Sequence, residues 1–213
     1  MRKHKYYCQF IGSVRSGHTL VSQMINSHKE AVISDECKAV SLYRKGFSRD
    51  KIFEKIIEKD KRWVKSGCLS FGYRYPVGHY QGNSDNAILI GDKHCGPDTG
   101  VFGDKEVLSG FMKCIDLPFK FIWVTREKYT QIKSMQNMLL RVKKKEYEDI
   151  NKVIEVWERQ RLISEEICQN HEVYIINIEE FLSDFDNEGR KLFEYLELEH
   201  DKLHLELCKK IIK

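Results

Sequence analysis

Five short apolar runs divide the chain, and most of them are separated by segments in which apolar residues recur every three or four positions. The runs cover residues 6–12, 31–34, 87–91, 119–125 and 172–178. Runs of this length, rich in Val, Ile, Phe and Tyr, are typical of buried strands, and the 3.6-residue period between them is typical of amphipathic helices. The alternation predicts an α/β architecture, in which helices cover both faces of a parallel sheet.

The helical pattern begins just after Gly17, where Leu20, Val21, Met24 and Ile25 fall on one face of a helix. The same pattern returns over residues 50–65, 105–115, 129–142, 149–169, 188–196 and 201–212. The three prolines, at positions 76, 97 and 118, fall outside all of these segments. We therefore expect the strands to alternate with uninterrupted helices.

Residues 66–86 form the longest stretch without a period, and they are rich in Gly, Tyr, Ser and Asn. This composition predicts a long loop, and long loops in compact domains are frequent sites of binding. Tyr73, Tyr75 and Tyr80 are candidates to line a substrate pocket there, although aromatic loop residues serve as packing anchors at least as often.

The bulk properties narrow the class of protein. The 213 residues, 41% of them hydrophobic, are enough for one well-buried core, so we expect a single domain over 1–213. The net charge of +4, from 36 basic and 32 acidic residues, argues against a dedicated nucleic-acid binder. No apolar run approaches the length of a membrane span. Seven scattered cysteines without a CxxC pair argue against a zinc site and favour reduced thiols, which indicates a cytoplasmic protein.

Candidate chemistry begins where the first strand ends, in the sequence FIGSVRSGHTL, residues 10–20. Gly12 and Gly17 have the spacing of the phosphate loop GxxxxGK[ST], but His18 replaces the lysine and Arg15 lies inside the loop. A strand, a glycine turn and a helix start direct backbone N–H groups and the helix dipole at one point, which is an anion site. The alternative is a tight strand-to-helix turn with a solvent-facing arginine.

The stretch RSGHTL, residues 15–20, resembles the 5′-phosphosulfate loop of the sulfotransferases, whose common forms read (K/R)SGTT(W/L). The arginine form is most similar to that of the tyrosylprotein sulfotransferases. The resemblance implies binding of the donor 3′-phosphoadenosine 5′-phosphosulfate (PAPS) by Arg15, Ser16, Gly17, His18, Thr19 and Leu20. His18 replaces the first threonine of the motif, so one hydroxyl contact of the family lacks its residue here.

A second motif lies in FIWVTREKYTQIKSM, where Arg126 follows a strand and Ser134 comes eight residues later on a helix. The pair resembles the arginine and serine with which sulfotransferases hold the 3′-phosphate of the nucleotide. An arginine offers bidentate, charge-assisted hydrogen bonds, and a hydroxyl two turns along lies on the same helix face. Alone, an exposed arginine and a helix serine would explain the pair, but two motifs in the family's order favour a nucleotide with phosphates at both ends.

Catalytic candidates follow two other predicted strands. Lys93 ends the sequence AILIGDK and resembles a lysine of the sulfotransferases, which with Arg15 would neutralise charge on the sulfuryl group and the bridging oxygen. Glu36 resembles the acidic base of the tyrosylprotein enzymes, and His94 resembles the histidine of cytosolic relatives, so both are candidates for the base. Asp35 either raises the pKa of Glu36 through like-charge repulsion or is a turn residue.

The resemblance covers most of residues 6–200, and it implies a three-layer α/β/α domain with a central parallel sheet, the P-loop-NTPase-like sulfotransferase fold. Its clearest gap is the glycine- and lysine-rich C-terminal segment that closes over the nucleotide in cytosolic sulfotransferases. The basic run RVKKK, residues 141–145, either assists the nucleotide in its place or is a solvated helix end.

The implied reaction transfers a sulfuryl group from PAPS to an acceptor hydroxyl on a peptide tyrosine, a carbohydrate or a small molecule, without a metal and without a nucleic-acid or membrane partner. Two other functions stay open. In a P-loop kinase, Asp92 would hold magnesium for ATP, although the missing loop lysine argues against that chemistry. In a non-catalytic nucleotide-binding module, Glu36, Lys93 and His94 need not converge.

Overall fold

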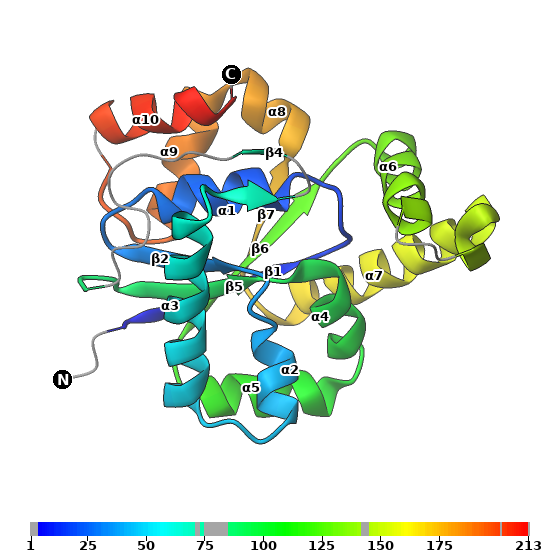
Figure 1. The fold of residues 1–213 in the computed structure, drawn as a ribbon, viewed down its shortest axis with the longest axis horizontal. Coiled ribbons are helices and arrows are strands. Elements are labelled where there is room, and N and C mark those ends of the chain that lie inside the picture. Colours follow the sequence, from blue (N-terminus) through cyan, green and yellow to red (C-terminus); the bar gives the residue numbers. More distant parts are fainter. Residues whose placement is uncertain (1–3, 71–72, 75–84, 142–144, 201, 213) are drawn as a thin grey trace.

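A parallel sheet forms the centre of the molecule (Figure 1). The computed structural model describes residues 4–70, 73–74, 85–141, 145–200 and 202–212, and within them the sheet has five strands in the order β2-β5-β1-β6-β7. The bounds are β1 (Tyr6–Ile11), β2 (Ala31–Asp35), β5 (Leu89–Lys93), β6 (Phe119–Thr125) and β7 (Val173–Asn177). Because every neighbouring pair is parallel, all these strands end at one edge, where open α/β sheets bind ligands.

Helices cover both faces of the sheet (Figure 1). One face carries α1 (His18–Asn26), α8 (Ile178–Ser183), α9 (Phe185–Tyr195) and α10 (Lys202–Ile212). The other face carries α2 (Ala39–Arg44), α3 (Arg49–Lys65), α5 (Lys105–Ile115) and α7 (Ile150–Asn170). Ile122 belongs to the apolar cluster of the first face and Phe121 to that of the second, because successive strand residues point to opposite faces.

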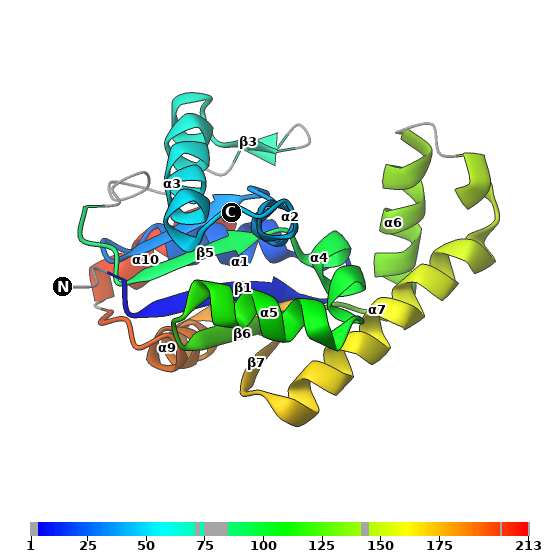
Figure 2. The ribbon, with the colours of Figure 1, turned by 90° about the horizontal axis from the view of Figure 1, so that it is seen from below.

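Two further helices follow strands at the binding edge. α4 (Cys95–Phe102) follows β5, and α6 (Lys128–Arg141) follows β6. A short 3-10 helix (Lys145–Glu148) leads from the region of α6 into α7, and Figure 2 shows α6 and the start of α7 extending beyond the sheet as an arm. Ile132, Met135 and Val153 form a small apolar cluster inside this arm. None of the described helices is long and apolar enough to cross a membrane.

The three-layer α/β/α architecture and the parallel sheet predicted from the alternation are confirmed, with small shifts at the ends of the elements. The 3.6-residue period does not reveal α2, α4 and α8, because helices of six to eight residues are too short to show it. In α4 the pattern is further masked by two glycines and by Pro97, which lies in the first helical turn, where a proline is tolerated.

The segment 66–86, predicted as one loop, contains a short antiparallel pair of strands. β3 (Leu69–Ser70) pairs there with β4 (Tyr73–Arg74). Two-residue strands are below the length at which alternation can be recognised in a sequence, so the pattern could not predict them. Tyr75, Tyr80 and residues 142–144 of the basic run lie outside the described residues.

Candidate functional site

The loop between β1 and α1 is built around two glycines in the left-handed region. Gly12 has φ 100° and Gly17 has φ 105°, a conformation that other residues rarely adopt. Space is also short, because an added Cβ would lie 2.6 Å from Cδ1 of Trp123 at Gly12 and 2.8 Å from Cγ1 of Ile178 at Gly17. The glycine spacing read from the sequence therefore has both a conformational and a steric cause.

Arg15 also has a positive φ, 69°, although it carries a side chain. The left-handed conformation costs a non-glycine residue about 1–2 kcal/mol, and residues held in it cluster at functional sites. The turn directs the loop into the first turn of α1, whose free N–H groups and dipole favour an anion. The structure thus places a tight glycine turn and a helix start directly after β1, as the sequence predicts.

His18 lies inside this loop rather than at its surface. Its buried ring donates Nε2–H to the carbonyl oxygen of Ile11 at 3.1 Å, so its Nδ1 accepts from the hydroxyl of Ser16 at 2.7 Å. Burial lowers the pKa of His18 to about 3, which keeps the ring neutral. The histidine therefore braces the loop, and it also engages the hydroxyl proton of Ser16, which the sequence suggested as a donor to phosphate.

The two motifs that are predicted to bind the nucleotide are far apart in the sequence but meet in the structure. Arg15 donates Nε–H to the hydroxyl of Ser134 on α6 at 3.0 Å. Arg126, at the end of β6, donates from a terminal nitrogen to the carbonyl oxygen of Arg15 at 3.4 Å and lies 3.6 Å from a carboxylate oxygen of Glu179. The atom of Arg126 in this ion pair is Nε, which is buried and makes no hydrogen bond within the described residues. An anion bound between these side chains would supply one.

Lys93 lies beside both acidic residues at the end of β2, Asp35 in the strand and Glu36 just after it. Asp35 and Lys93 are register partners in the β2–β5 ladder, so their side chains lie on the same face, with Nζ 2.6 Å from the carboxylate of Asp35. The carboxylate of Glu36 accepts a hydrogen bond from Nζ of Lys93 at 3.2 Å. Burial lowers the pKa of Lys93, but the charges of Asp35 and Glu36 outweigh burial and leave the pKa raised. Lys93 is therefore a fully charged ammonium at the binding edge.

The contact of Asp35 with Lys93 is one that sequence reasoning missed. The sequence was interpreted in terms of repulsion between Asp35 and Glu36, whereas the structure places both carboxylates on a shared cation. The signal that could have revealed this is strand register, which a single sequence does not contain. Glu36 itself has φ 60°, so the loop after β2, like the loop after β1, holds a non-glycine residue in the left-handed region.

Asp92 points to the opposite face of the sheet and has a structural role. Its carboxylate is fully buried and accepts from the hydroxyl of Ser34 and from the backbone N–H groups of Cys37 and Ala39, at 2.7 to 2.9 Å. Burial raises the pKa of Asp92 and these hydrogen bonds oppose that rise. Asp92 therefore holds the turn from β2 into α2, and its oxygens are already engaged.

His94 is bonded to an aspartate of the helix that follows it. Its Nδ1 lies 2.9 Å from the carboxylate of Asp98, one turn along α4. Burial lowers the pKa of His94, but the hydrogen bond and charge of Asp98 outweigh it, so the pKa is raised. Burial in turn raises the pKa of Asp98 to about 6. Sequence reasoning missed Asp98, although its spacing of four residues from His94 on a helix is a usable signal.

A pocket of about 300 Å³ joins these elements at the carboxyl edge of the sheet. Its lining residues are Val14, Arg15, Gly17, His18, Thr19, Leu20, Glu36, Lys93, Cys95, Arg126 and Met138. Of the two candidate bases, Glu36 lines this pocket and His94 does not. Ser134 and Ser16 are not among the lining residues, but each is hydrogen-bonded to one of them. Ser134 bonds to Arg15, and Ser16 bonds to His18. The pocket is therefore lined by three cationic side chains, Arg15, Lys93 and Arg126, and by one carboxylate, that of Glu36.

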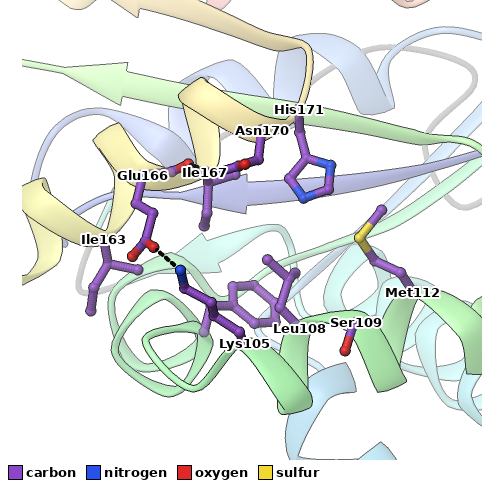
Figure 3. A pocket seen from close by; sticks show the side chains of 10 residues that line it. Lys105, Leu108, Ser109, Met112, Ile163, Glu166, Ile167, Asn170 and His171 are labelled. Atoms are coloured by element: carbon purple, nitrogen blue, oxygen red, sulfur yellow. Dashed lines mark hydrogen bonds and ion pairs between the residues drawn. The ribbon is translucent and has the colours of Figure 1, made fainter.

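A second pocket, of about 220 Å³, lies between α5 and the end of α7 (Figure 3). Its floor is apolar, with Leu108 and Ile167, and an ion pair of 2.5 Å between Lys105 and Glu166 crosses it. The end of α7 leads into the start of β7, so this pocket lies toward the amino edge of the sheet. It contains none of the side chains singled out by the sequence.

Comparison with known proteins bears on the fold. No family model matches the sequence, and no curated protein does. The chain is similar to the sulfotransferase domain of the Synechococcus PCC 7002 olefin synthase, with a TM-score of 0.56 and 14% identity over 95% of this chain and 76% of that one. For the sulfotransferase domain from the curacin biosynthetic pathway the TM-score is 0.58, with 14% identity over 95% and 76%.

The sulfotransferase STF9 from Mycobacterium avium matches with a TM-score of 0.58 and 11% identity, over 97% of this chain and 67% of that one. These identities are low, but the matches span nearly the whole chain and agree with one another. The features that match are the central parallel sheet and the helices that flank it. The chain therefore has the fold of the sulfotransferases.

Proposed function

We propose that this protein is a sulfotransferase that moves a sulfuryl group from PAPS to an acceptor hydroxyl. The observation that carries the proposal is the convergence of Arg15, Arg126, Lys93 and Glu36 on one pocket, with Ser134 bonded to Arg15. Arg15, Glu36 and Arg126 directly follow β1, β2 and β6 in the chain or lie in the loops after them, and Lys93 is the last residue of β5. The scattered cysteines favour a reducing compartment, so we place the enzyme in the cytoplasm.

The residues fit a nucleotide with phosphates at both ends. The turn from Gly12 to Gly17 and the start of α1 would hold the 5′-phosphosulfate through backbone N–H groups, with Arg15, Thr19 and Leu20 beside it. The Nε of Arg126 is paired with Glu179 at 3.6 Å without a hydrogen bond, so the guanidinium would hold the 3′-phosphate together with Ser134. Ser16 and His18 would shape the loop from inside.

The chemistry needs alignment and charge neutralisation more than covalent help. The acceptor oxygen forms a bond to sulfur while the bond between sulfur and the bridging oxygen breaks, and the electron pair leaves with the 5′-phosphate. Arg15 and Lys93 would stabilise charge on the bridging and sulfuryl oxygens. Glu36 would accept the acceptor's proton, a contribution typically worth ~10²–10⁴-fold. His94 is the second candidate for the base, and its ring is bonded to Asp98 outside the pocket.

The position of Asp92 argues against the kinase alternative. Both of its carboxylate oxygens accept hydrogen bonds from groups of β2 and the turn into α2, and the side chain is fully buried. A magnesium ligand of a P-loop kinase has to face the phosphates. The convergence of Lys93 and Glu36 in one pocket also argues against a module that only binds nucleotides, which has no need of such a pair.

A thermal-shift comparison tests the proposal. We expect 3′-phosphoadenosine 5′-phosphate (PAP) without metal to raise the melting temperature well above the effect of ATP with magnesium. At a 100-fold excess over the dissociation constant, binding stabilises the folded state by about 2.7 kcal/mol, roughly 5–10 °C for a domain of this size. If ATP with magnesium raised the melting temperature more than PAP does, the proposal that this protein is a sulfotransferase would be wrong.

A further inference from the structure

Lys93 has two carboxylate partners that are held with different firmness. Asp35 ends β2, is buried, and lies 2.6 Å from Nζ as a register partner in the ladder. Glu36 lies just beyond the strand at 3.2 Å, has φ 60°, and leaves 41% of its side chain exposed. Asp35 is therefore the permanent partner of Lys93, and Glu36 is the partner that can leave.

The ammonium of Lys93 is almost closed off while both carboxylates surround it. Lys93 is only 3% exposed, yet it lines the same pocket as Arg15 and Arg126. Glu36 also lines this pocket, so it lies on the side from which a ligand approaches. A donor oxygen can reach Nζ of Lys93 once Glu36 moves aside.

We propose that Glu36 is an internal stand-in for the anionic donor: its carboxylate occupies Lys93 until the 5′ group of the nucleotide displaces it. This inference rests on the proposed function and deepens it. Asp35 acts as a positioning residue that keeps Lys93 charged and aimed at the pocket throughout. The displaced carboxylate then faces the acceptor, so the base becomes available only after the donor is bound.

The exchange conserves the charge around the buried ammonium. Before it, Lys93 is paired with Asp35 and Glu36, and after it, with Asp35 and an oxygen of the nucleotide. A buried charge left without a partner is strongly unfavourable, whereas replacement of one anion by another avoids that penalty. The structure therefore favours ordered binding, with the donor before the acceptor.

The affinity for PAPS, measured by calorimetry in the absence of an acceptor, tests whether Glu36 competes with the donor for Lys93. Glu36→Gln and Glu36→Gly both remove the competing carboxylate, and glycine also suits the positive φ at this position. Both variants should bind PAPS roughly 2- to 5-fold more tightly than the wild type, the range expected for a partly exposed ion pair. Glu54→Gln removes a carboxylate from a surface pair with Lys51 on α3 and should leave the affinity unchanged.

Removal of the Glu36 carboxylate could also tighten binding simply because it reduces repulsion of any anionic ligand. Adenosine 3′-phosphate distinguishes this effect from displacement of Glu36, because it lacks the 5′ group that would reach Lys93. Its affinity should not improve in the Glu36 variants, and an equal gain for both ligands would overturn the inference. If the wild type binds neither PAPS nor PAP, both the proposed function and this inference are wrong. If the wild type binds PAPS and neither Glu36 variant binds it more tightly, the inference alone is wrong.

The positioning role of Asp35 has its own readout. In Asp35→Asn the burial of Lys93 is no longer offset by its closest carboxylate, so the pKa of the ammonium falls. PAPS affinity should then decline on the alkaline side at a lower pH than in the wild type. A folded Asp35→Asn variant with the wild-type pH profile would remove Asp35 from this role.

Discussion

The Nε–H of Arg15 donates to the hydroxyl of Ser134 at 3.0 Å, although the two residues are 119 positions apart. Arg15 belongs to the glycine loop after β1 and Ser134 to α6, so this bond joins the two halves of the proposed nucleotide site. Arg126 reaches the carbonyl oxygen of Arg15 from the end of β6. A nucleotide with phosphates at both ends would therefore enter a site whose two anion-binding parts already contact each other.

Arg126→Ala should weaken the binding of PAP much more than it changes the stability of the fold. Loss of a charge-assisted hydrogen bond costs about 1.5–3 kcal/mol, which is roughly a 10- to 150-fold loss of affinity. Calorimetry measures the affinity, and Arg190→Ala, an exposed arginine on α9, is the matched control. Unchanged affinity in a folded Arg126→Ala variant would remove this arginine from the site.

Ser134→Ala should also weaken the binding of PAP, but with a smaller effect than Arg126→Ala, since it removes a neutral hydroxyl.

Asp92→Ala should destabilise the protein strongly. It leaves the hydroxyl of Ser34 and the N–H groups of Cys37 and Ala39 without their acceptor. A buried polar group without a partner costs about 1–3 kcal/mol, so we expect a loss of about 3 kcal/mol or more in the free energy of unfolding, measured by urea denaturation. Asp50→Ala, on an exposed aspartate of α3, is the control. Wild-type stability in Asp92→Ala would contradict the structural role of this carboxylate.

The buried ring of His18 makes stability depend on pH. Its pKa is lowered from 6.5 to about 3, so between these values the unfolded chain binds a proton that the folded chain does not. The stabilising contribution is complete above pH 6.5 and is lost as the pH falls toward 3, by up to about 1.4 kcal/mol per pH unit. His18→Thr should flatten this part of the stability profile in urea titrations at several pH values. A His18→Thr variant with the same slope as the wild type would exclude the effect.

Glu36→Gln should lower turnover by roughly 10²-fold or more without weakening the binding of the nucleotide. The reason is that Glu36 would take the acceptor's proton, and a glutamine cannot. His94→Ala should have a smaller effect, because its ring is bonded to Asp98 and lies outside the pocket lining. The measurement is transfer of labelled sulfate from PAPS to an acceptor, across a range of pH. If His94→Ala instead abolishes turnover and shifts the acid limb of the rate profile, His94 is the base.

The sequence alone determined the architecture of the domain and the positions of the candidate residues along it. The five apolar runs became the five strands of the sheet, because a buried parallel strand must be apolar on both faces. Gly12 and Gly17 marked the loop after β1, because only glycine tolerates both their φ values and the contacts with Trp123 and Ile178. Strand formation and the position of a glycine turn depend mainly on residues that are close together in the chain, so a single sequence can reveal them.

The tertiary structure alone decided which of the candidate side chains share a pocket. Strand register places Asp35 opposite Lys93, and the alternation of side chains along β5 sends Lys93 to the pocket and Asp92 to the opposite face. The same geometry leaves His94 with Asp98 on α4. Register and the packing of distant helices depend on contacts between residues remote in the sequence, and a shift of one residue would exchange the faces, which no local pattern specifies.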